Sequence, residues 1–553
     1  MALRLKPIKI LITVAIFLLW CLCGWAAFRF RWIFPFADDW DIITPLVDHY
    51  YKTGSLSWSQ IFDQHNEHRI ALLKLVFFVD QVVFGGRNLF SVFVSFAAQT
   101  LSFVLIYRWI ERLDFKESIK GLLQLIVAGL LFSTSNALDY SREAGIYLCY
   151  ALALSSLAVL RRSVWASVLF AALASYSMGQ GVWVWPCLLL FAVLERFSKR
   201  KFAIIIVVGA GVLISYFYSF EFPAHHYHPL KAGVSLTAIS SFLIYFLGNC
   251  FYPVLENNSP AMGLLAIIWS LILLYKILES GKFRSRDSDF NFGLVGFVYF
   301  LGVASVAAMT RWGFGQDFAL DSRYAITTIF VWVFLISLTL IVLKGKPVFR
   351  LIGLGFFGIL LVPNLLGPIK GSYYLSSIKR LTAYGLSVGV YDPDLISLFY
   401  IPEQVIRYLD VYQKYDFNQL MSQSHLATDE GVEKYSKLVE CEYGNIQIKP
   451  IAYHAKGIEG HSIRANLRTI DDVRMMNPRI RVFDIDGKSI GYGELQGFDT
   501  PLYWMSRGLE SPVEIAILTR SPVRVGAKLF FFDHAGDQAC SYVMTDKDFE
   551  SNP

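Results

Sequence analysis

The sequence predicts a mainly α-helical protein that crosses a membrane many times. Its composition is the first reason: 55% of the 553 residues are hydrophobic and only 17% are charged, whereas soluble domains carry about 25% charged residues. The second reason is the recurrence of apolar runs of about 17 to 25 residues, each long enough to cross a bilayer. The formal net charge of +6 comes from Lys and Arg clusters between these runs, so it does not indicate a nucleic-acid-binding surface.

Counting the apolar runs gives about 11 spans, within a range of about 10 to 13. The basic residues before the first run place the N-terminus inside, under the positive-inside rule. The block 163–195 is broken at Gly179-Gln180-Gly181 and is interpreted as two short spans, whereas the run 234–252 is interpreted as a re-entrant or interfacial helix. The predicted spans are 10–28, 88–110, 119–135, 144–160, two within 163–195, 202–220, 260–277, 290–309, 324–343 and 350–367.

The C-terminal part of the chain changes character, which predicts three regions. These are a membrane domain at 1–370, an extracytoplasmic helical segment at 371–440 and an extracytoplasmic β-rich domain at 441–553. Cys441 and Cys540 bracket the last region, and a disulfide between them is left open because its geometry is not visible in the sequence. Alternating strand patterns separated by turn signals favour a small β-sandwich, with strands near 479–483, 513–517 and 525–531.

An acidic stretch, Phe36-Ala37-Asp38-Asp39-Trp40-Asp41, follows the first span, and His65-Asn66-Glu67-His68-Arg69 follows in the same outer loop, 29–87. Carboxylates beside a bilayer are unfavourable unless they are solvated, paired or bound to a cation, so this loop is a candidate functional site. The alternative is a solvated turn in which Asp38 or Asp39 caps a helix.

The predicted topology brings several polar segments to the same outer face. Basic residues on that face run against the positive-inside bias, so each of them requires an anionic partner. The combination predicts an outer cavity that contains both carboxylates and arginines. The segments are 38–39, 66–69, 141–143, the histidine loop at 225–228, and 311–324.

These residue types suit the transfer of a sugar from a phosphate carrier. A carboxylate such as Asp38 or Asp39 can take the proton of an acceptor hydroxyl while that hydroxyl attacks the anomeric carbon of the sugar. The leaving group would be a phosphate, whose charge a guanidinium or ammonium group stabilises. Candidates for that role are Arg69, Arg311, Arg323 and Lys379, and a structural ion pair is the alternative for each.

A metal site in the outer loop is a further open alternative. Carboxylate and imidazole ligands suit a divalent cation such as Mg²⁺ or Mn²⁺, although a hydrogen-bonded network that braces the loop uses the same residues. The aromatic residues nearby would stack on a sugar or belong to an interfacial belt. The metal candidates are Asp38, Asp39, Glu67 and His68; the aromatic candidates are Phe36, Trp40, Tyr50, Tyr51 and Trp58.

A short basic start, one span and an outer loop with paired acidic residues resemble the C-type (GT-C) glycosyltransferases. The motifs Phe36-Ala37-Asp38-Asp39-Trp40, Asn66-Glu67-His68-Arg69, Arg311-Trp312-Gly313-Phe314-Gly315 and Ser322-Arg323-Tyr324 resemble a group of bacterial membrane proteins related to that class. The resemblance covers about residues 1–370 and implies a GT-C-like bundle in the bacterial inner membrane, with the C-terminal domain in the periplasm.

The same resemblance implies an activity and a set of site residues. The activity is inverting hexosyl or pentosyl transfer, at the outer face, from a polyprenyl-phosphate-linked sugar to an envelope glycan, a lipid or an exported protein. The implied base and its partner are Asp38 and Asp39. The implied substrate-binding residues are Trp40, Asp41, Asn66, Glu67, His68 and Arg69 in the loop, Arg311 and Arg323 at the donor phosphate, and Tyr324, which orients them.

Three alternatives to a transferase remain. A flippase or transporter of lipid-linked sugars would carry charges at mid-membrane and paired repeats with broken helices. A polymerase of lipid-linked sugars would share the same substrates. A non-catalytic subunit of envelope assembly would use the β-rich domain as its working part. Each of the three, like the transferase, would be surrounded by membrane lipids and would have no nucleic-acid partner.

Overall fold

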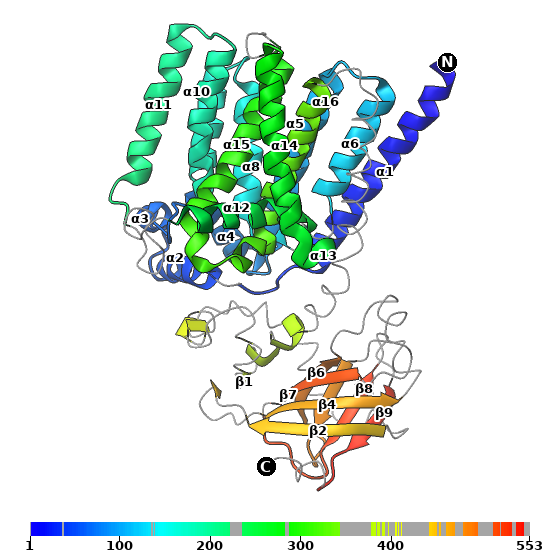
Figure 1. Cartoon of the computed structure of the whole chain (residues 1–553). Helices are drawn as coiled ribbons and strands as arrows, with labels where there is room; N and C mark the ends of the chain where they lie inside the picture. Colours follow the sequence, from blue (N-terminus) through cyan, green and yellow to red (C-terminus); the bar gives the residue numbers. More distant parts are fainter. Residues whose placement is uncertain are drawn as a thin grey trace. The chain divides into compact units, whose positions relative to one another are not determined.

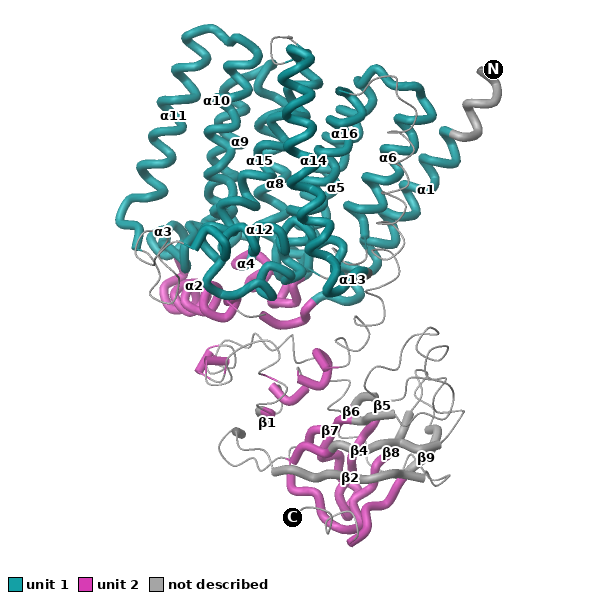
Figure 2. Tube along the Cα trace, viewed as in Figure 1, with its two compact units in different colours: residues 1–31, 57–77, 89–368 teal, residues 32–56, 78–88, 369–553 magenta. Residues whose placement is uncertain are grey.

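The computed structural model is mainly helical and carries a small antiparallel sheet near the C-terminus, which confirms the fold class at this level (Figure 1). The chain divides into two compact units (Figure 2): unit 1 comprises 1–31, 57–77 and 89–368, and unit 2 comprises 32–56, 78–88 and 369–553. The described residues are 2–35, 38–133, 137, 139–221, 235–282, 287–342, 378–382, 384–386, 390–392, 396, 404–405, 407–408, 411, 442–450, 453–454, 461–469, 479–495, 513–519, 521–532 and 538–546.

Unit 1 is a helical bundle. Its long helices are α1 (Ala2–Arg29), α5 (Leu89–Arg112), α11 (Lys199–Phe217), α14 (Ser259–Glu279), α15 (Ser288–Arg311) and α16 (Ala325–Val342). Its shorter helices are α3 (Trp58–Phe62), α6 (Glu117–Leu131), α8 (Ala144–Val159), α9 (Val164–Ser175), α10 (Val184–Leu194), α12 (Leu236–Gly248) and α13 (Tyr252–Leu255). Single 3-10 turns are η1 (Gly179–Trp183), η2 (Asn249–Phe251), η3 (Glu256–Asn258), η5 (Trp312–Phe314), η6 (Asp317–Leu320) and η7 (Ser322–Tyr324).

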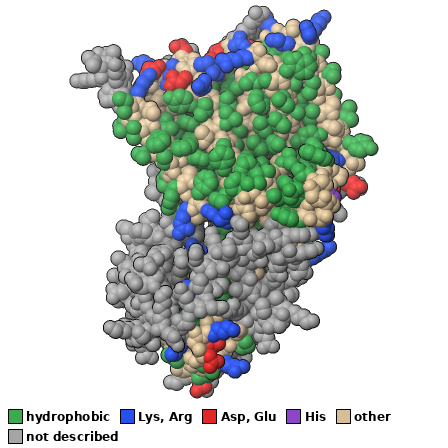
Figure 3. Space-filling model, turned by 180° about the vertical axis from the view of Figure 1, so that it is seen from behind, with side chains coloured by type: hydrophobic (Ala, Val, Ile, Leu, Met, Phe, Trp, Pro, Cys, Tyr) green, Lys and Arg blue, Asp and Glu red, His purple; other side chains and the backbone are tan. Residues whose placement is uncertain are grey.

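Six helical segments in the described part of the chain are long and apolar enough to cross a membrane, which supports a multi-pass membrane protein. They are Lys9–Arg29, Leu89–Arg112, Lys199–Phe217, Glu256–Glu279, Ser288–Phe314 and Ser322–Val342. Apolar side chains cover a broad band of the helical part (Figure 3). Large apolar side chains such as Ile214 on α11 and Ile272 on α14 are more than half exposed there, which suits contact with lipid.

The predicted count of eleven spans is not reached in the described residues. The run 350–367 lies outside them, and the regions 144–160 and 163–195 form helices of 10 to 17 residues, shorter than a typical span. Helix α8 is buried almost throughout by its neighbours. An apolar run that is enclosed by protein has the same hydropathy as one that faces lipid, so hydropathy alone leaves the count of eleven spans a prediction.

Helix α16 is the buried centre of unit 1, with nine-tenths of its span enclosed by the protein (89%). Helix α15 approaches it closely because its facing positions are glycines. A Cβ at Gly296 would lie 2.6 Å from the Phe334 ring of α16, and one at Gly293 would lie 3.2 Å from Leu338 of α16 and 2.5 Å from the Trp109 ring of α5. Small residues at a helix interface permit such packing, which drives helix association in membranes.

The connection between α15 and α16 is held in place by Asn249, at the end of α12. This asparagine is buried (2% exposed), and its Nδ2 donates hydrogen bonds to the carbonyl oxygens of Ala319, at 2.8 Å, and Asp321, at 2.9 Å. The Asn249 side chain therefore supplies hydrogen-bond donors to the irregular backbone of η6 and η7, where these carbonyl groups have no donor within a helix. Arg323 stands at the end of this connection.

Unit 2 contains α2 (Asp39–Thr53), and α4 (Ala71–Phe84) passes from unit 1 into it. Its seven-stranded sheet is antiparallel throughout, in the order β2 (Glu442–Pro450), β4 (His461–Thr469), β7 (Val513–Thr519), β6 (Ser489–Leu495), β5 (Arg479–Phe483), β8 (Lys528–Phe532) and β9 (Gln538–Val543). A separate pair joins β1 (Val390–Tyr391) to β3 (Tyr453–His454).

The predicted strands are present, but the described ones are hydrogen bonded into one sheet and not into the two sheets of a sandwich. One face buries Ile463 and Ile517, which are direct cross-strand partners. On the other face, Leu518 packs in a cluster with Ile378 and Leu381 of a short helical piece. The sheet is thus apolar on both faces and uses a helix as cover. Cys441 lies outside the described residues, and with it the predicted disulfide.

The last segment of unit 2 begins at residue 369, beside the predicted boundary at 370. Parts of the first outer loop, 32–56 and 78–88, belong to the same compact unit as the C-terminal region. Lys379 illustrates this, because its Nζ lies 4.1 Å from the centre of the Trp32 ring. A cation over an aromatic ring is an attractive contact that a sequence-based boundary cannot anticipate.

We predict that Asn249→Leu lowers the free energy of unfolding by about 1 to 3 kcal/mol, because the carbonyl groups of Ala319 and Asp321 lose their donors in a buried place. Thermal unfolding of the purified protein in detergent measures this as a lower midpoint. The matched control is Asn257→Leu, at an exposed position of η3. Equal unfolding midpoints for the two variants would show that the hydrogen bonds of Asn249 contribute nothing to stability.

Candidate functional site

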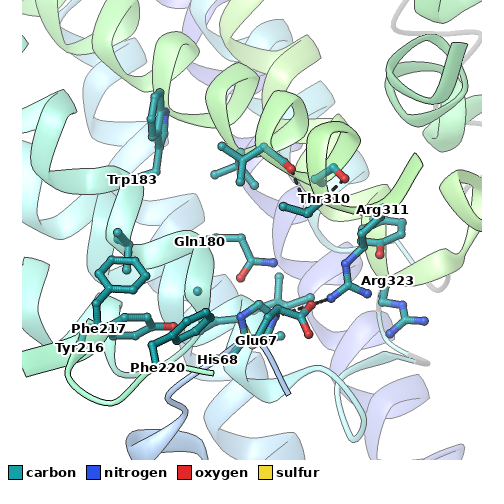
Figure 4. Close-up of a pocket in the computed structure, with 18 residues that line it drawn as sticks. Glu67, His68, Gln180, Trp183, Tyr216, Phe217, Phe220, Thr310, Arg311 and Arg323 are labelled. Atoms are coloured by element: carbon teal, nitrogen blue, oxygen red, sulfur yellow. Dashed lines mark hydrogen bonds and ion pairs between the residues drawn. The ribbon is translucent and has the colours of Figure 1, made fainter. Parts of the chain in front are cut away.

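A cavity of about 390 Å³ lies within unit 1 (Figure 4). It is formed by the turn 65–68, the 3-10 turn η1, the end of α11, the last turns of α15 and the start of α16. Its walls are mostly apolar or aromatic, with a few polar side chains that converge from distant parts of the chain, as is usual for small-molecule sites. The polar side chains used below are Glu67, His68, Gln180, Arg311, Arg323 and Tyr324.

Glu67 and His68 reach the cavity from a tight turn. The backbone groups of His65 and His68 exchange hydrogen bonds of 2.8 and 2.9 Å. Asn66 has a φ of +48°, in the left-handed region that asparagine tolerates better than most residues. Gly179 permits the imidazole to pack closely, since a Cβ there would lie 2.4 Å from His68 Nδ1. The turn therefore presents two adjacent polar side chains on one side.

An ion pair connects this turn to the end of α15. Glu67 Oε1 pairs with Arg311 Nη2, and His68 Nε2 lies 3.3 Å from the same carboxylate oxygen. Both side chains of the Glu67–Arg311 pair are mostly buried. The pair joins the turn 65–68 to the arginine-bearing segment 311–324 that the sequence singled out. Such a charge-assisted hydrogen bond is stronger than one between neutral groups.

Two guanidinium groups meet at one aromatic ring on this side of the cavity. The Cζ atoms of Arg311 and Arg323 lie 5.9 and 5.2 Å from the centre of the Phe318 ring. Arg323 Nη2 also donates to Asp321 Oδ2 at 2.8 Å. The ring and the carboxylate hold both cations near each other, although like charges repel, so the site is suited to an anion.

Two polar atoms of this side have no hydrogen-bond partner among the described residues: Arg323 Nε and the hydroxyl oxygen of Tyr324. Tyr324 is only 5% exposed. A buried polar group without a partner costs about 1 to 3 kcal/mol, so such groups need an explanation. A ligand that brings oxygen atoms to Arg323 and Tyr324 supplies one.

Buried carboxyl groups stand behind Arg323. Asp139 Oδ1 accepts hydrogen bonds from Ser322 Oγ at 3.1 Å and from Arg142 Nη1 at 3.3 Å. Burial raises the pKa of the Glu143 carboxyl to about 7, although Arg323 and Arg142 act to lower it. Burial also raises the pKa of Asp139. One of the carboxyl groups near Arg323, that of Glu143, therefore changes its ionisation near neutral pH.

Arg69, one of the four candidates for the phosphate-binding role, has a structural position in which backbone carbonyl groups surround its guanidinium group. Its Nε donates to the carbonyl oxygen of Tyr216 at 2.6 Å and its Nη1 to that of Phe62 at 2.7 Å, while Nη2 donates to the carbonyl oxygen of Tyr218. Its backbone N–H donates to the Tyr216 hydroxyl at 3.1 Å. Carbonyl groups at the C-terminal end of α11 attract a cation, which explains how a buried arginine is satisfied without a carboxylate.

The acidic stretch 38–41 belongs to unit 2. Asp38 is exposed and precedes α2, whereas Asp39 is buried (5% exposed). Asp41 Oδ1 accepts a hydrogen bond of 2.7 Å from the Tyr408 hydroxyl. Trp40 is buried (1% exposed), so its ring packs inside the protein and has no face for a sugar to stack on.

The remaining predicted groups are placed as follows. Tyr51 and Trp58 are exposed, whereas Phe36 and the histidines at 225–228 lie outside the described residues. No group of three or more His, Cys, Asp or Glu side chains in the described ranges lies close enough to hold a metal ion. Glu67 and His68 are adjacent in the cavity, but the predicted cation site that combines them with Asp38 and Asp39 is not assembled within either unit.

Part of the cavity was not anticipated from the sequence. Gln180 and Trp183 come from η1, and an aromatic wall comes from the end of α11, with Tyr216, Phe217 and Phe220. One signal was available: a glutamine flanked by two glycines interrupts an apolar block, and polar residues inside membrane segments are a default indication of function. The aromatic wall carries no such signal, because its residues are ordinary at a membrane interface.

Comparisons with protein-family models, with curated proteins and with solved structures found no match to this chain.

We predict that Glu143→Gln makes stability less dependent on pH. Because burial raises the carboxyl pKa from 4.5 to about 7, the folded state binds the proton more tightly than the unfolded state. The contribution of this group therefore becomes more unfavourable as pH rises through that interval. The unfolding midpoint of the variant minus that of wild type should become more positive between about pH 5 and about pH 8.

The matched control is Asn257→Leu, an exposed substitution that removes no titratable group, for which the difference should stay constant with pH. A constant difference for Glu143→Gln as well would show that this carboxyl titrates alike in the folded and unfolded states.

Proposed function

We propose that this protein is an integral-membrane glycosyltransferase that takes a sugar from a polyprenyl-phosphate carrier. The observation that carries the proposal is the cavity of unit 1, which is lined by two arginines, by a tyrosine hydroxyl without a hydrogen-bond partner among the described residues, and by an apolar and aromatic wall. An anionic headgroup joined to a hydrocarbon chain has the same two-part chemistry. The cavity volume of about 390 Å³ is within the usual range for small-molecule sites.

The phosphate of the donor binds Arg311, Arg323 and Tyr324 in this proposal. Guanidinium groups suit phosphate oxygens because their donors form a planar fork. The same contacts stabilise the charge that grows on the phosphate when its bond to the sugar breaks. Glu67 holds Arg311 in place through their ion pair, and His68 contacts the Glu67 oxygen that takes part in this pair.

The transfer itself is an inverting displacement. The acceptor hydroxyl oxygen forms a bond to the anomeric carbon, the bond from that carbon to the phosphate oxygen breaks, and its electron pair stays on the phosphate. The hydroxyl proton goes to a carboxylate, which we assign to Asp38 or Asp39 in the acidic stretch. Of these two, Asp38 is exposed and Asp39 is buried, so Asp38 is the more accessible proton acceptor.

The acceptor is an envelope glycan, lipid or exported protein, and the reaction takes place at the outer face of a bacterial inner membrane. The supporting pattern is the distribution of basic residues around the apolar runs, which places the acidic and arginine-bearing segments opposite the N-terminus. A flippase would bind the same lipid without breaking the bond between sugar and phosphate, and the experiment below separates the two functions.

We predict that Asp38→Asn lowers the rate of sugar transfer about 10² to 10⁴-fold, because a positioned general base contributes about that much. The measurement is transfer of label from a panel of radiolabelled polyprenyl-phosphate sugars in membranes that contain wild type or variant. Asp39→Asn and Glu67→Gln are tested beside it. The matched control is Asp48→Asn, since Asp48 lies on the same helix and makes a surface ion pair with Lys52.

Loss of transfer in Asp38→Asn or Asp39→Asn with full activity in Asp48→Asn supports the proposal and identifies the base. Loss in Glu67→Gln alone would exclude both aspartates as the base and leave Glu67 as the essential carboxylate, either as the base or as the partner of Arg311. Folded protein that moves the lipid-linked sugar across the bilayer without consuming it would refute the transferase and establish the flippase.

We predict that Arg323→Gln lowers transfer about 10² to 10³-fold, the usual effect of removing a donor that stabilises a developing negative charge. Arg311→Gln should lower it similarly and, in addition, lower the unfolding midpoint, because it leaves buried Glu67 without its cation. The control is Arg112→Gln, whose arginine pairs with Asp289 at an exposed site outside the cavity. Normal transfer by Arg323→Gln would remove this arginine from the phosphate site.

A further inference from the structure

Gln180 is the neutral polar group in the middle of the cavity. It lies on η1, where its backbone carbonyl oxygen accepts a hydrogen bond of 3.3 Å from the Tyr299 hydroxyl. Its side-chain Oε1 is buried and has no hydrogen-bond partner among the described residues. Figure 4 shows the amide between the aromatic wall on one side and the Glu67–Arg311 pair on the other.

The position of this amide is fixed by close backbone packing on each side of it. Gly179 lies against the His68 imidazole, and a Cβ at Gly181 would lie 2.0 Å from the carbonyl oxygen of Ala174. Two glycines therefore allow η1 to pass between the turn 65–68 and α9, and they leave Gln180 as the side chain that projects from the turn into the cavity. A buried amide oxygen that has no hydrogen-bond partner among the described residues is expected where a ligand donates to it.

The aromatic wall is also held in place. Arg69 contacts both the backbone and the hydroxyl of Tyr216, at 2.6 and 3.1 Å, and the Tyr216 ring lies 5.1 Å from that of Phe217 in an edge-to-face arrangement. Phe217 in turn contacts Phe220 at 5.5 Å between ring centres. Arg69 therefore positions the aromatic rings that lie opposite Arg311 and Arg323.

We infer that Gln180 and this aromatic wall form the subsite for the sugar ring, and that Gln180 recognises at least one sugar hydroxyl. The inference rests on the proposed function and specifies where the donor's sugar lies and which residue selects it. A side-chain amide offers one acceptor and two donors and carries no charge, which suits hydroxyl groups and not the phosphate. Arg311 and Arg323 bind the phosphate, so the sugar and the phosphate of one headgroup bind to different residues.

A site that forms a hydrogen bond with a ligand hydroxyl discriminates strongly against a ligand without it, because the buried protein group is then left unpaired. Gln180 is therefore the residue that should set the sugar preference, whereas Arg311 and Arg323 should bind every polyprenyl phosphate alike. This division makes the inference testable by comparing two lipids that differ only by the sugar.

The experiment measures binding by native mass spectrometry of the full-length protein in detergent. The probes are undecaprenyl phosphate and undecaprenyl phosphate that carries glucose, galactose, mannose or arabinose. For the sugar that wild type binds most tightly, Gln180→Met should bind the sugar-bearing lipid about tenfold more weakly, a loss of one hydrogen bond to a buried group. The same variant should bind undecaprenyl phosphate as wild type does.

The control variant is Gln124→Leu, which removes a buried amide that pairs with Glu111 outside the cavity, and which should bind both lipids normally. Equal weakening of both lipids in Gln180→Met, or unchanged binding of every sugar-bearing lipid, would overturn the sugar subsite while leaving the proposed function in place. Wild type that binds neither kind of lipid would overturn both, and this outcome is recognised before any variant is measured.

Discussion

The ion pair between Glu67 and Arg311 is the contact on which the cavity depends. Glu67 stands on a short turn after the first outer helices, and Arg311 is the last residue of α15. Neither charge is well solvated, and an isolated buried charge is strongly unfavourable, so each residue requires the other. Their contact fixes the distance between the turn and the end of α15, and the space enclosed between them is the cavity.

Other contacts extend the same arrangement to the remaining walls. Arg69, two residues after Glu67, binds the carbonyl groups at the end of α11, so one short segment attaches to two helices that are far apart in the sequence. Asn249 does the same for the connection that carries Arg323. The helices themselves pack through apolar side chains and glycines, but the polar contacts at their ends determine which side chains face inward.

The distribution of charge gives the cavity two chemically different sides. Arg311 and Arg323 share the Phe318 ring on one side, and rings from the end of α11 form the other, with the Gln180 amide between them. Asp321 limits the positive charge of Arg323, and its pKa stays below the usual value: burial acts to raise it, but the neighbouring guanidinium outweighs burial. A partly balanced cation binds an anion reversibly, and the proposed transferase requires this in order to release its polyprenyl phosphate.

Composition and hydropathy alone determined the class of the protein, because burial of apolar side chains in lipid or in a helical bundle requires such a sequence whatever its neighbours are. The strand pattern at 479–483 matches β5, since alternation in a sheet is a local property. The sequence also identified Glu67, His68, Arg311, Arg323 and Tyr324 as unusual charged or polar residues near apolar runs, and the structure brings them to one cavity.

Tertiary structure decided the rest. An apolar run has the same hydropathy in lipid and in protein, so only the fold shows that α8 is enclosed by neighbouring helices. The sequence does not distinguish an arginine that binds a phosphate from one that binds the carbonyl groups at a helix end. Only the fold shows that Arg69 binds the end of α11 and that Arg323 lines the cavity. The role of Gln180 becomes visible only in the fold, where η1 places its amide between the arginine side and the aromatic side of the cavity. Ligand recognition depends on distances in space, which the order of residues along the chain does not give.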